Sequence, residues 1–114
     1  MSANAFAPQQ NLTVMLGVTA TSTSTPLQVK AAQAQGSMTQ RLFYNAGPNT
    51  CFLVGAATAA LAVAVAPTAG SPQLGVPIGA GAHMVLSFPP NTFFAAICAA
   101  AQTASLYITP GEGN

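Results

Sequence analysis

The C-terminal third of the chain, residues 82–113, contains three short runs of strand-like sequence, and these runs limit what the chain can fold into. The first and last, residues 82–88 and 103–109, carry an apolar side chain at every second position, the period of a strand with one buried face. The middle run, residues 92–99, is apolar on both faces, so we expect both faces to be buried. Pro89-Pro90-Asn91 and Gln102 separate the runs, and Pro110-Gly111 ends the last one. The pattern predicts an antiparallel sheet with one dry side.

The same period recurs in shorter runs upstream. These further predicted strands are residues 12–18, 27–31, 38–45, 50–54, 61–65 and 76–78. Gly47 and Pro48 suit a tight turn, so residues 41–54 are predicted to form a β-hairpin. Many short strands without a convincing amphipathic helix predict an all-β, single-domain antiparallel β-sandwich, jelly-roll-like, over residues 11–114. Residues 1–10 lack this period and are predicted to form an extended N-terminal arm that orders when it docks.

Charge is the unusual quantity in the composition. Lys30, Arg41 and Glu112 are the only charged residues, 3% of the chain, whereas roughly 25% is usual. The formal net charge of +1 is below the magnitude of about 2 to 8 that usually keeps copies of a small domain apart. We infer that copies of the chain, as a dimer or trimer, or another protein cover much of its surface. The alternative is a monomer kept soluble by hydroxyl and amide groups.

The same composition argues against several classes of partner and site. No basic patch exists, so nucleic acid is not an expected partner. A metal site needs about four ligands, and only His83, Glu112, Cys51 and Cys98 offer candidates, so His83 is interpreted as an ordinary exposed or interface histidine. A catalytic triad needs an orienting acid, and Glu112 lies in a glycine-rich tail. We expect no catalytic, cofactor-binding or metal-binding residues and no enzymatic activity.

The two cysteines, Cys51 and Cys98, each fall inside a predicted strand. The N-terminus shows neither a basic start nor an apolar run, so no secretory signal is expected. Without export the cysteines are predicted to be buried thiols. A disulfide would require their strands to be adjacent at the right separation.

Residues 51–66 have an alternative interpretation as a membrane helix, because the run is apolar and rich in alanine. It is shorter than the roughly 20 residues that span a bilayer. It also has no flanking lysine or arginine to set an orientation. We therefore expect no membrane partner, although a small membrane protein such as a lysis factor remains the function that this alternative would imply.

Four segments carry a resemblance to a known group of proteins: residues 41–47 (RLFYNAG), 50–55 (TCFLVG), 76–81 (VPIGAG) and 104–113 (ASLYITPGEG). Together they resemble small β-rich structural proteins of tailed-bacteriophage virions, and the LYITPGEG ending is the most specific part. The resemblance covers roughly residue 40 to the C-terminus and includes no catalytic motif.

The resemblance implies a virion component and leaves its place in the particle open. A protein of the capsid surface, assembled in the host cytoplasm, fits best. We expect a homo-oligomeric capsid decoration or cement protein that binds the major capsid protein and stabilises the head. The alternative is a head or tail fibre or connector module for host or glycan attachment.

Overall fold

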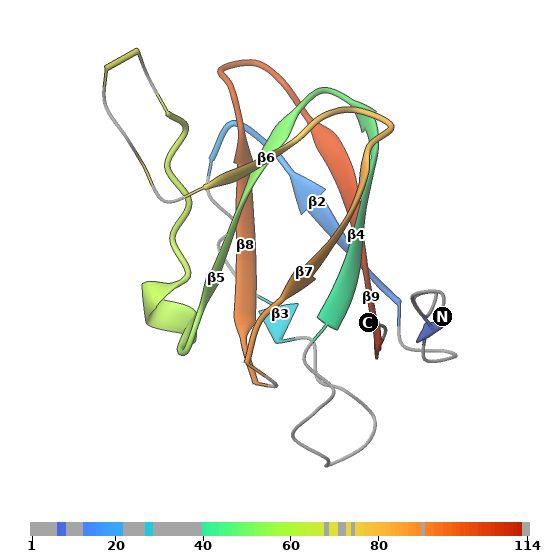
Figure 1. Ribbon diagram of the computed structural model, residues 1–114. Helices are drawn as coiled ribbons and strands as arrows, with labels where there is room; N and C mark the ends of the chain where they lie inside the picture. Colours follow the sequence, from blue (N-terminus) through green and yellow to red (C-terminus); the bar gives the residue numbers. More distant parts are fainter. Residues whose placement is uncertain are drawn as a thin grey trace.

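Figure 1 presents the computed structural model, which describes residues 7–8, 13–21, 27–28, 40–67, 69–70, 73, 75–89 and 91–112. These residues form an all-β structure of two antiparallel sheets. The first sheet contains β1 (Ala7–Pro8), β2 (Val14–Val18), β4 (Gln40–Pro48), β7 (His83–Ser87) and β9 (Ala104–Glu112). The second sheet contains β3 (Leu27–Gln28), β5 (Cys51–Ala56), β6 (Val76–Ile78) and β8 (Phe93–Cys98).

The strand order interleaves the two sheets along the chain. In the first sheet β9 lies between β4 and the pair β1 and β2, and β7 is the far edge beside β4. In the second sheet the order is β3-β8-β5-β6. Among the described strands, every connection except β1 to β2 and β5 to β6 passes from one sheet to the other. Neighbours in each sheet are therefore mostly far apart in sequence.

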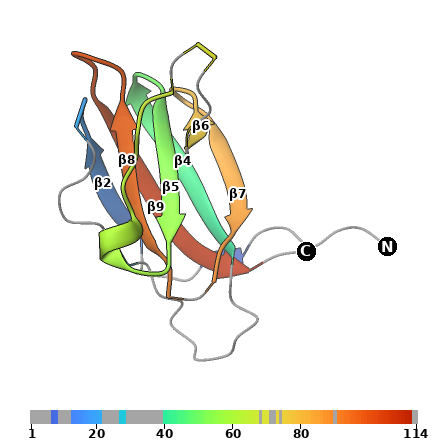
Figure 2. The ribbon, with the colours of Figure 1, turned by 90° about the vertical axis from the view of Figure 1, so that its left-hand side faces the viewer.

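The inner faces of the two sheets pack against each other (Figures 1 and 2). The buried cluster takes side chains from both: Leu16, Val18, Phe43, Cys51, Leu53, Ile78, Phe94, Ala96, Cys98, Ala104, Leu106 and Ile108. The Phe43 ring of the first sheet meets the Phe94 ring of the second edge-to-face, with centroids 5.4 Å apart. Phe88 completes this aromatic cluster, with its centroid 5.9 Å from that of Phe43 and 5.0 Å from that of Phe94. The dry side predicted from the alternation of residues 82–88 and 103–109 is confirmed.

β8 is buried on both faces, as its sequence predicts. Phe94 points into the core, and the neighbouring Ala95, on the outer face, is also fully buried. A segment of the chain, residues 57–67, lies over this outer face of the second sheet (Figure 2). We call it the covering segment. Its Ala62 and Ala64 are buried, since only small side chains fit where it lies against the sheet.

The prediction of a strand at residues 61–65 is wrong. The covering segment instead starts with a short 3-10 helix, η1 (Ala59–Leu61), and residues 62–67 belong to no strand. Thr58 caps η1, because its Oγ1 accepts a hydrogen bond from the Leu61 backbone N–H at 3.3 Å. The alternation itself is real, with alanines inward and Leu61, Val63 and Val65 exposed. The segment packs on the outer face of the second sheet and pairs with none of the described strands.

The prediction of a β-hairpin at residues 41–54 is also wrong, because β4 and β5 lie in different sheets. β4 pairs with β7 and β9, whereas β5 pairs with β6 and β8. The connection between them is organised by Asn45, whose side chain is completely buried. Its Nδ2 donates to the carbonyls of Asn49 and Ile78, both at 2.8 Å, and its Oδ1 accepts from the Gly47 N–H at 2.7 Å. Gly47 has a φ of +90°, a conformation that glycine adopts without strain.

The structure bears on three further predictions, for residues 51–66, 1–10 and 27–31. Residues 51–66 begin with strand β5, so the membrane-helix interpretation is wrong. Within the described ranges no helix has the length and apolar character needed to cross a membrane. Of the predicted arm at residues 1–10, Ala7–Pro8 pairs with the end of β9, and the other residues lie outside those described. Of the predicted strand at residues 27–31, Leu27–Gln28 forms β3 and the rest also lies outside.

Candidate functional site

The residues with reactive side chains do not gather at one surface site. His83 is exposed on the outer face of the first sheet, whereas Cys51 and Cys98 are buried in the core as free thiols. In the part of the chain that the structure describes, no three His, Cys, Asp or Glu residues are grouped so that they could hold a metal ion. The surfaces that the described side chains form are therefore considered as candidate binding sites.

The most distinctive surface feature is a row of side chains across the outer face of the first sheet. The strand register aligns Met15 of β2, Tyr107 of β9, Tyr44 of β4 and His83 of β7. Directly opposite residues in antiparallel strands share a face and touch. The Tyr44 and His83 rings stack with centroids 4.5 Å apart and planes at 21°. The Tyr44 and Tyr107 rings follow at 6.3 Å and 23°. We call these four residues the aromatic row.

Beside the aromatic row lies a second line of uncharged side chains. Leu42 pairs with Val85 on one side and with Thr109 on the other. The Thr109 hydroxyl is hydrogen-bonded to that of Thr13 at 2.8 Å. Met15, Val85 and Tyr107 expose 52%, 43% and 38% of their surface. This face thus combines apolar contact area with hydroxyl groups that form hydrogen bonds.

Arg41 is the one charged residue whose side chain the structure describes, and this side chain does not reach the surface. It lies on the inner face of β4 and is 0% exposed. Its Nη1 donates to the Phe88 carbonyl at 2.9 Å, and its guanidinium carbon lies 5.7 Å from the centroid of the Phe94 ring. Burial away from water lowers the pKa of the guanidinium from its usual value. No Lys, Arg, Asp or Glu side chain reaches the surface formed by the described side chains, since those of Lys30 and Glu112 lie outside them.

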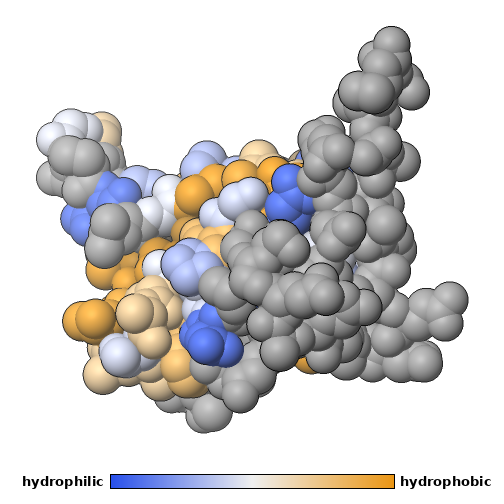
Figure 3. All heavy atoms as spheres, turned by 60° about the horizontal axis from the view of Figure 1, so that its bottom comes forward, coloured by the Kyte–Doolittle hydropathy of each residue, from blue (hydrophilic) through white to orange (hydrophobic). Residues whose placement is uncertain are grey.

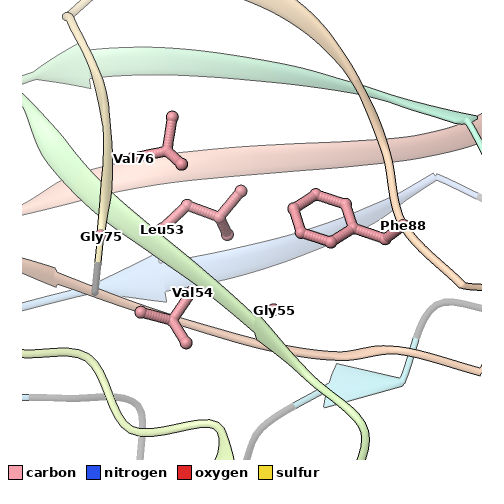
Figure 4. Close-up of a pocket in the computed structure, with 6 residues that line it drawn as sticks. All are labelled: Leu53, Val54, Gly55, Gly75, Val76 and Phe88. Atoms are coloured by element: carbon pink, nitrogen blue, oxygen red, sulfur yellow. The ribbon is translucent and has the colours of Figure 1, made fainter.

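An apolar pocket of about 200 Å³ opens beside the edge strand β6 (Figure 4). It is lined by Leu53, Val54, Gly55, Gly75, Val76 and Phe88. Gly55 makes room for Phe88, because a Cβ at this position would lie 2.7 Å from the Phe88 Cε1. Because no lining side chain carries a polar atom, the pocket can accept an apolar group but has no side chain to orient a polar substrate.

A second apolar surface lies on the opposite side of the molecule from the aromatic row. The covering segment exposes Leu61, Val63 and Val65 over the second sheet. Figure 3, which brings the lower end of the molecule forward, shows apolar residues across much of the described surface, with hydrophilic residues scattered among them. Both layers therefore present uncharged, partly apolar surface to their surroundings.

No family model, curated protein or solved structure matches this chain. The resemblance of residues 41–47 and 104–113 to phage virion proteins consequently stays a prediction. The absence of catalytic, cofactor-binding and metal-binding residues also stays a prediction, because the side chains of Lys30 and Glu112 are outside the described ones.

The sequence indicates that His83 is an ordinary exposed or interface residue, but it does not bring His83 together with Tyr44 and Tyr107. Each falls on the face of its strand opposite the apolar core positions. In β7 and β9 this alternation is evident in the sequence, whereas the two faces of β4 each mix polar and apolar residues. The register that puts the three rings in one row depends on pairing between strands distant in sequence, which alternation does not encode.

Proposed function

We propose that the chain is a bacteriophage virion structural protein, a decoration or cement protein that binds the major capsid protein lattice and stabilises the head. The observation that carries this proposal is a surface poor in charge: Lys30, Arg41 and Glu112 are the only charged residues of the chain, and Arg41 is buried in the core. Such a surface does not repel its own copies, and it suits permanent burial against other proteins. The mechanism is buried interface area, and no covalent bond is made or broken.

The proposed architecture is a jelly-roll β-sandwich. Its support is the strand order: with β1 set aside, eight strands make two four-stranded sheets, β2-β9-β4-β7 and β3-β8-β5-β6. A jelly roll likewise has eight strands in two sheets linked by two Greek keys, and viral capsid domains are among the proteins built this way. Because one fold can host many functions, the proposed role rests on the apolar surfaces of the first-sheet face and the covering segment.

A cement protein has to contact the shell and its own neighbours at the same time. The two apolar surfaces, the first-sheet face with Met15 and Val85 and the covering segment with Leu61 and Val63, lie on opposite layers. We propose that the first-sheet face binds the major capsid protein and that the covering segment serves contacts between copies, as a dimer or trimer. Attachment of an oligomer at several points of a repeating lattice multiplies a modest affinity.

The predicted arm at residues 1–10 would add a further contact. Its Ala7–Pro8 segment pairs with β9 opposite Gly111 and Glu112, at the edge of the first sheet. We propose that the arm extends the first-sheet interface onto a neighbouring capsid subunit, where strand pairing gives affinity through backbone hydrogen bonds.

The test uses particles of the virus that encodes the chain, with and without it, and two matched variants. Val85→Lys places a charge on the first-sheet face, and Val63→Lys places one on the covering segment, at positions 43% and 53% exposed. We expect many copies per particle, genome loss at lower temperature from particles without the protein, and failure of Val85→Lys to rebind purified shells. Val63→Lys should still bind the shells while self-associating less. Equal heat resistance of particles with and without the protein would contradict the cement role.

A second candidate function, a glycan-attachment module on a head or tail fibre, is favoured by the aromatic row. Tyr44, Tyr107 and His83 are aromatic, and the nearby hydroxyls of Thr13 and Thr109 could bond to a sugar. This function predicts only a handful of copies per particle and saturable binding of oligosaccharides that Tyr107→Ala abolishes. A high copy number with no glycan binding would reject it.

A further inference from the structure

We infer that Cys51 and Cys98 are placed to form a cross-strand disulfide between β5 and β8 when the reduced protein meets an oxidising small-molecule disulfide. The two residues are direct partners in the antiparallel register of these strands. Both side chains point into the core, where they are 0% and 1% exposed. Direct partners on one face have their Cβ atoms about 4.5 to 5.5 Å apart, which brings the two sulfur atoms within reach of each other.

The hydrogen-bond pattern shows which kind of pair this is. In an antiparallel ladder, opposite residues either exchange two backbone hydrogen bonds, with Cα atoms about 5.5 Å apart, or exchange none, with Cα atoms about 4.5 Å apart. The Cys98 N–H donates to the Thr19 carbonyl at 2.8 Å, so it is not used for an exchange with Cys51. The pair is thus of the closer kind, and its expected Cα separation lies within the range of about 4.4 to 6.8 Å that disulfides occupy.

The position of the pair gives an oxidant a route to the sulfur atoms. Cys51 is the first residue of β5 and Cys98 is the last residue of β8. Their neighbours Thr50 and Ala99 are exposed. Opening of this one end of the ladder, a small local unfolding event, exposes both thiols while the rest of the sheet stays intact.

The chemistry is thiol–disulfide exchange with a small disulfide such as oxidised glutathione. One cysteine loses its proton, and its thiolate attacks a sulfur of the oxidant; this forms a mixed disulfide and releases one glutathione thiolate, which takes up the proton. The second cysteine then loses its proton and attacks the protein sulfur of the mixed disulfide, so that the second glutathione leaves as a thiol. The two cysteines are oxidised to one disulfide, and one oxidised glutathione is reduced to two thiols.

The surroundings make this step slow while the fold is closed. Burial, with a further contribution from the negative charge of the neighbouring Cys98, raises the pKa of the Cys51 thiol to about 11. Burial also raises the pKa of Cys98. The thiolate is the attacking species, so at neutral pH the reaction proceeds through the opened state. In a reducing cytoplasm the pair stays as thiols, and it closes in an oxidising medium.

The crosslink would enclose residues 52–97, which contain the covering segment, β6 and β7. A disulfide over a loop of this length restricts the unfolded chain strongly. We expect the melting temperature to rise by on the order of 10 °C.

The test equilibrates the unaltered chain in mixtures of oxidised and reduced glutathione, folded in one series and in concentrated urea in the other, followed by alkylation and mass spectrometry. We expect an internal disulfide to form, and this form is about 2 Da lighter than the dithiol. The ratio of oxidised to reduced glutathione that is needed to form it should be more than tenfold lower for the folded chain than for the chain in urea. The melting temperature should rise and return to its starting value with reductant. Cys51→Ala and Cys98→Ala should each give only the glutathione adduct.

Equal ratios in the two series would overturn the inference, as would mixed disulfides or intermolecular dimers as the only products of the unaltered chain. The comparison of folded and urea-denatured chain does not depend on either variant folding. The inference is also independent of the proposed virion function, so each can fail without the other.

Discussion

Asn45→Ala is expected to destabilise the protein more than its single small side chain suggests. The Asn45 amide makes three hydrogen bonds, to the carbonyls of Asn49 and Ile78 and from the Gly47 N–H, all between 2.7 and 2.8 Å. It is fully buried, and these bonds join the end of β4 to the crossover and to β6 in the other sheet. Each such bond contributes about 1 kcal/mol net, which gives a loss of about 3 kcal/mol for the variant.

Urea denaturation followed by far-ultraviolet circular dichroism measures this loss, and Asn49→Ala is the matched control. The Asn49 side chain is only partly buried and donates one hydrogen bond, from Nδ2 to the Thr103 carbonyl at 3.1 Å. The control should therefore lose no more than about 1 kcal/mol. If Asn45→Ala cost no more than Asn49→Ala, the conclusion that Asn45 organises the crossover between the sheets would be refuted.

The variant Asn45→Asp is expected to make the stability of the protein depend on pH. The substituted carboxylate would face two carbonyl oxygens in a buried site, so its folded pKa is expected to be raised above the unfolded value of about 3.9. A group with a raised folded pKa stabilises the fold fully below the unfolded pKa, and this contribution is lost as the pH rises through the folded pKa. The variant should thus be more stable at pH 4 than at pH 7, and equal stability at the two pH values would contradict the burial of this site.

Three further perturbations test other parts of the structure. Gly55→Ala should lower the free energy of unfolding by about 1 to 3 kcal/mol, because the new Cβ would lie 2.7 Å from the Phe88 ring. Gly79→Ala is the control, since a Cβ at that position meets nothing within 4 Å. Equal urea midpoints for the two variants would refute the close approach. Phe43→Ala should lower the free energy of unfolding by about 3 to 5 kcal/mol, since the Phe43 ring is fully buried between Phe88 and Phe94. If thermal unfolding showed a smaller loss of stability than for Gly55→Ala, this would count against a core shared by the two sheets. Alkaline pH should destabilise the reduced protein, because the folded pKa of Cys51 is about 11 against an ordinary 9.0. The contribution of the protonated Cys51 thiol to stability is fully present below about pH 9, and roughly 2 to 3 kcal/mol of it is lost as the pH rises to 11. Cys51→Ala should flatten this alkaline decline, and an unchanged slope would exclude the thiol as its cause.

Strands with one buried face, such as β7 and β9, are predicted correctly because their period of two coincides with burial on that face. Leu106 and Ile108 are completely buried and Tyr107 between them is exposed, as the alternation indicates. The same rule fails at residues 61–65, because alternation reports that one face is covered and does not distinguish strand pairing from packing on top of a sheet. Both situations bury alternate side chains.

The hairpin prediction failed for a reason that lies outside the segment concerned. The end of β4 contains Gly47 and Pro48, which suit a tight hairpin, but the Asn45 side chain of the same strand donates a hydrogen bond to Ile78, 33 residues along the chain. Local turn chemistry contains no information on this partner. The burial of Arg41 was not visible either, because the two faces of β4 each mix polar and apolar residues. The aromatic row depends on the register of three strand pairs, which no single segment specifies.

The withdrawal of Arg41 into the core has a consequence for how the molecule behaves in an electrolyte. With Arg41 buried, Lys30 and Glu112 are the only other charged residues of the chain, so mobile ions have little fixed charge to screen. Adhesion to charged resins and mobility in an electric field should then be weak and nearly independent of ionic strength. The balance between solvation of such a molecule and its association with a neighbour then depends on the hydration of its hydroxyl, amide and methyl groups.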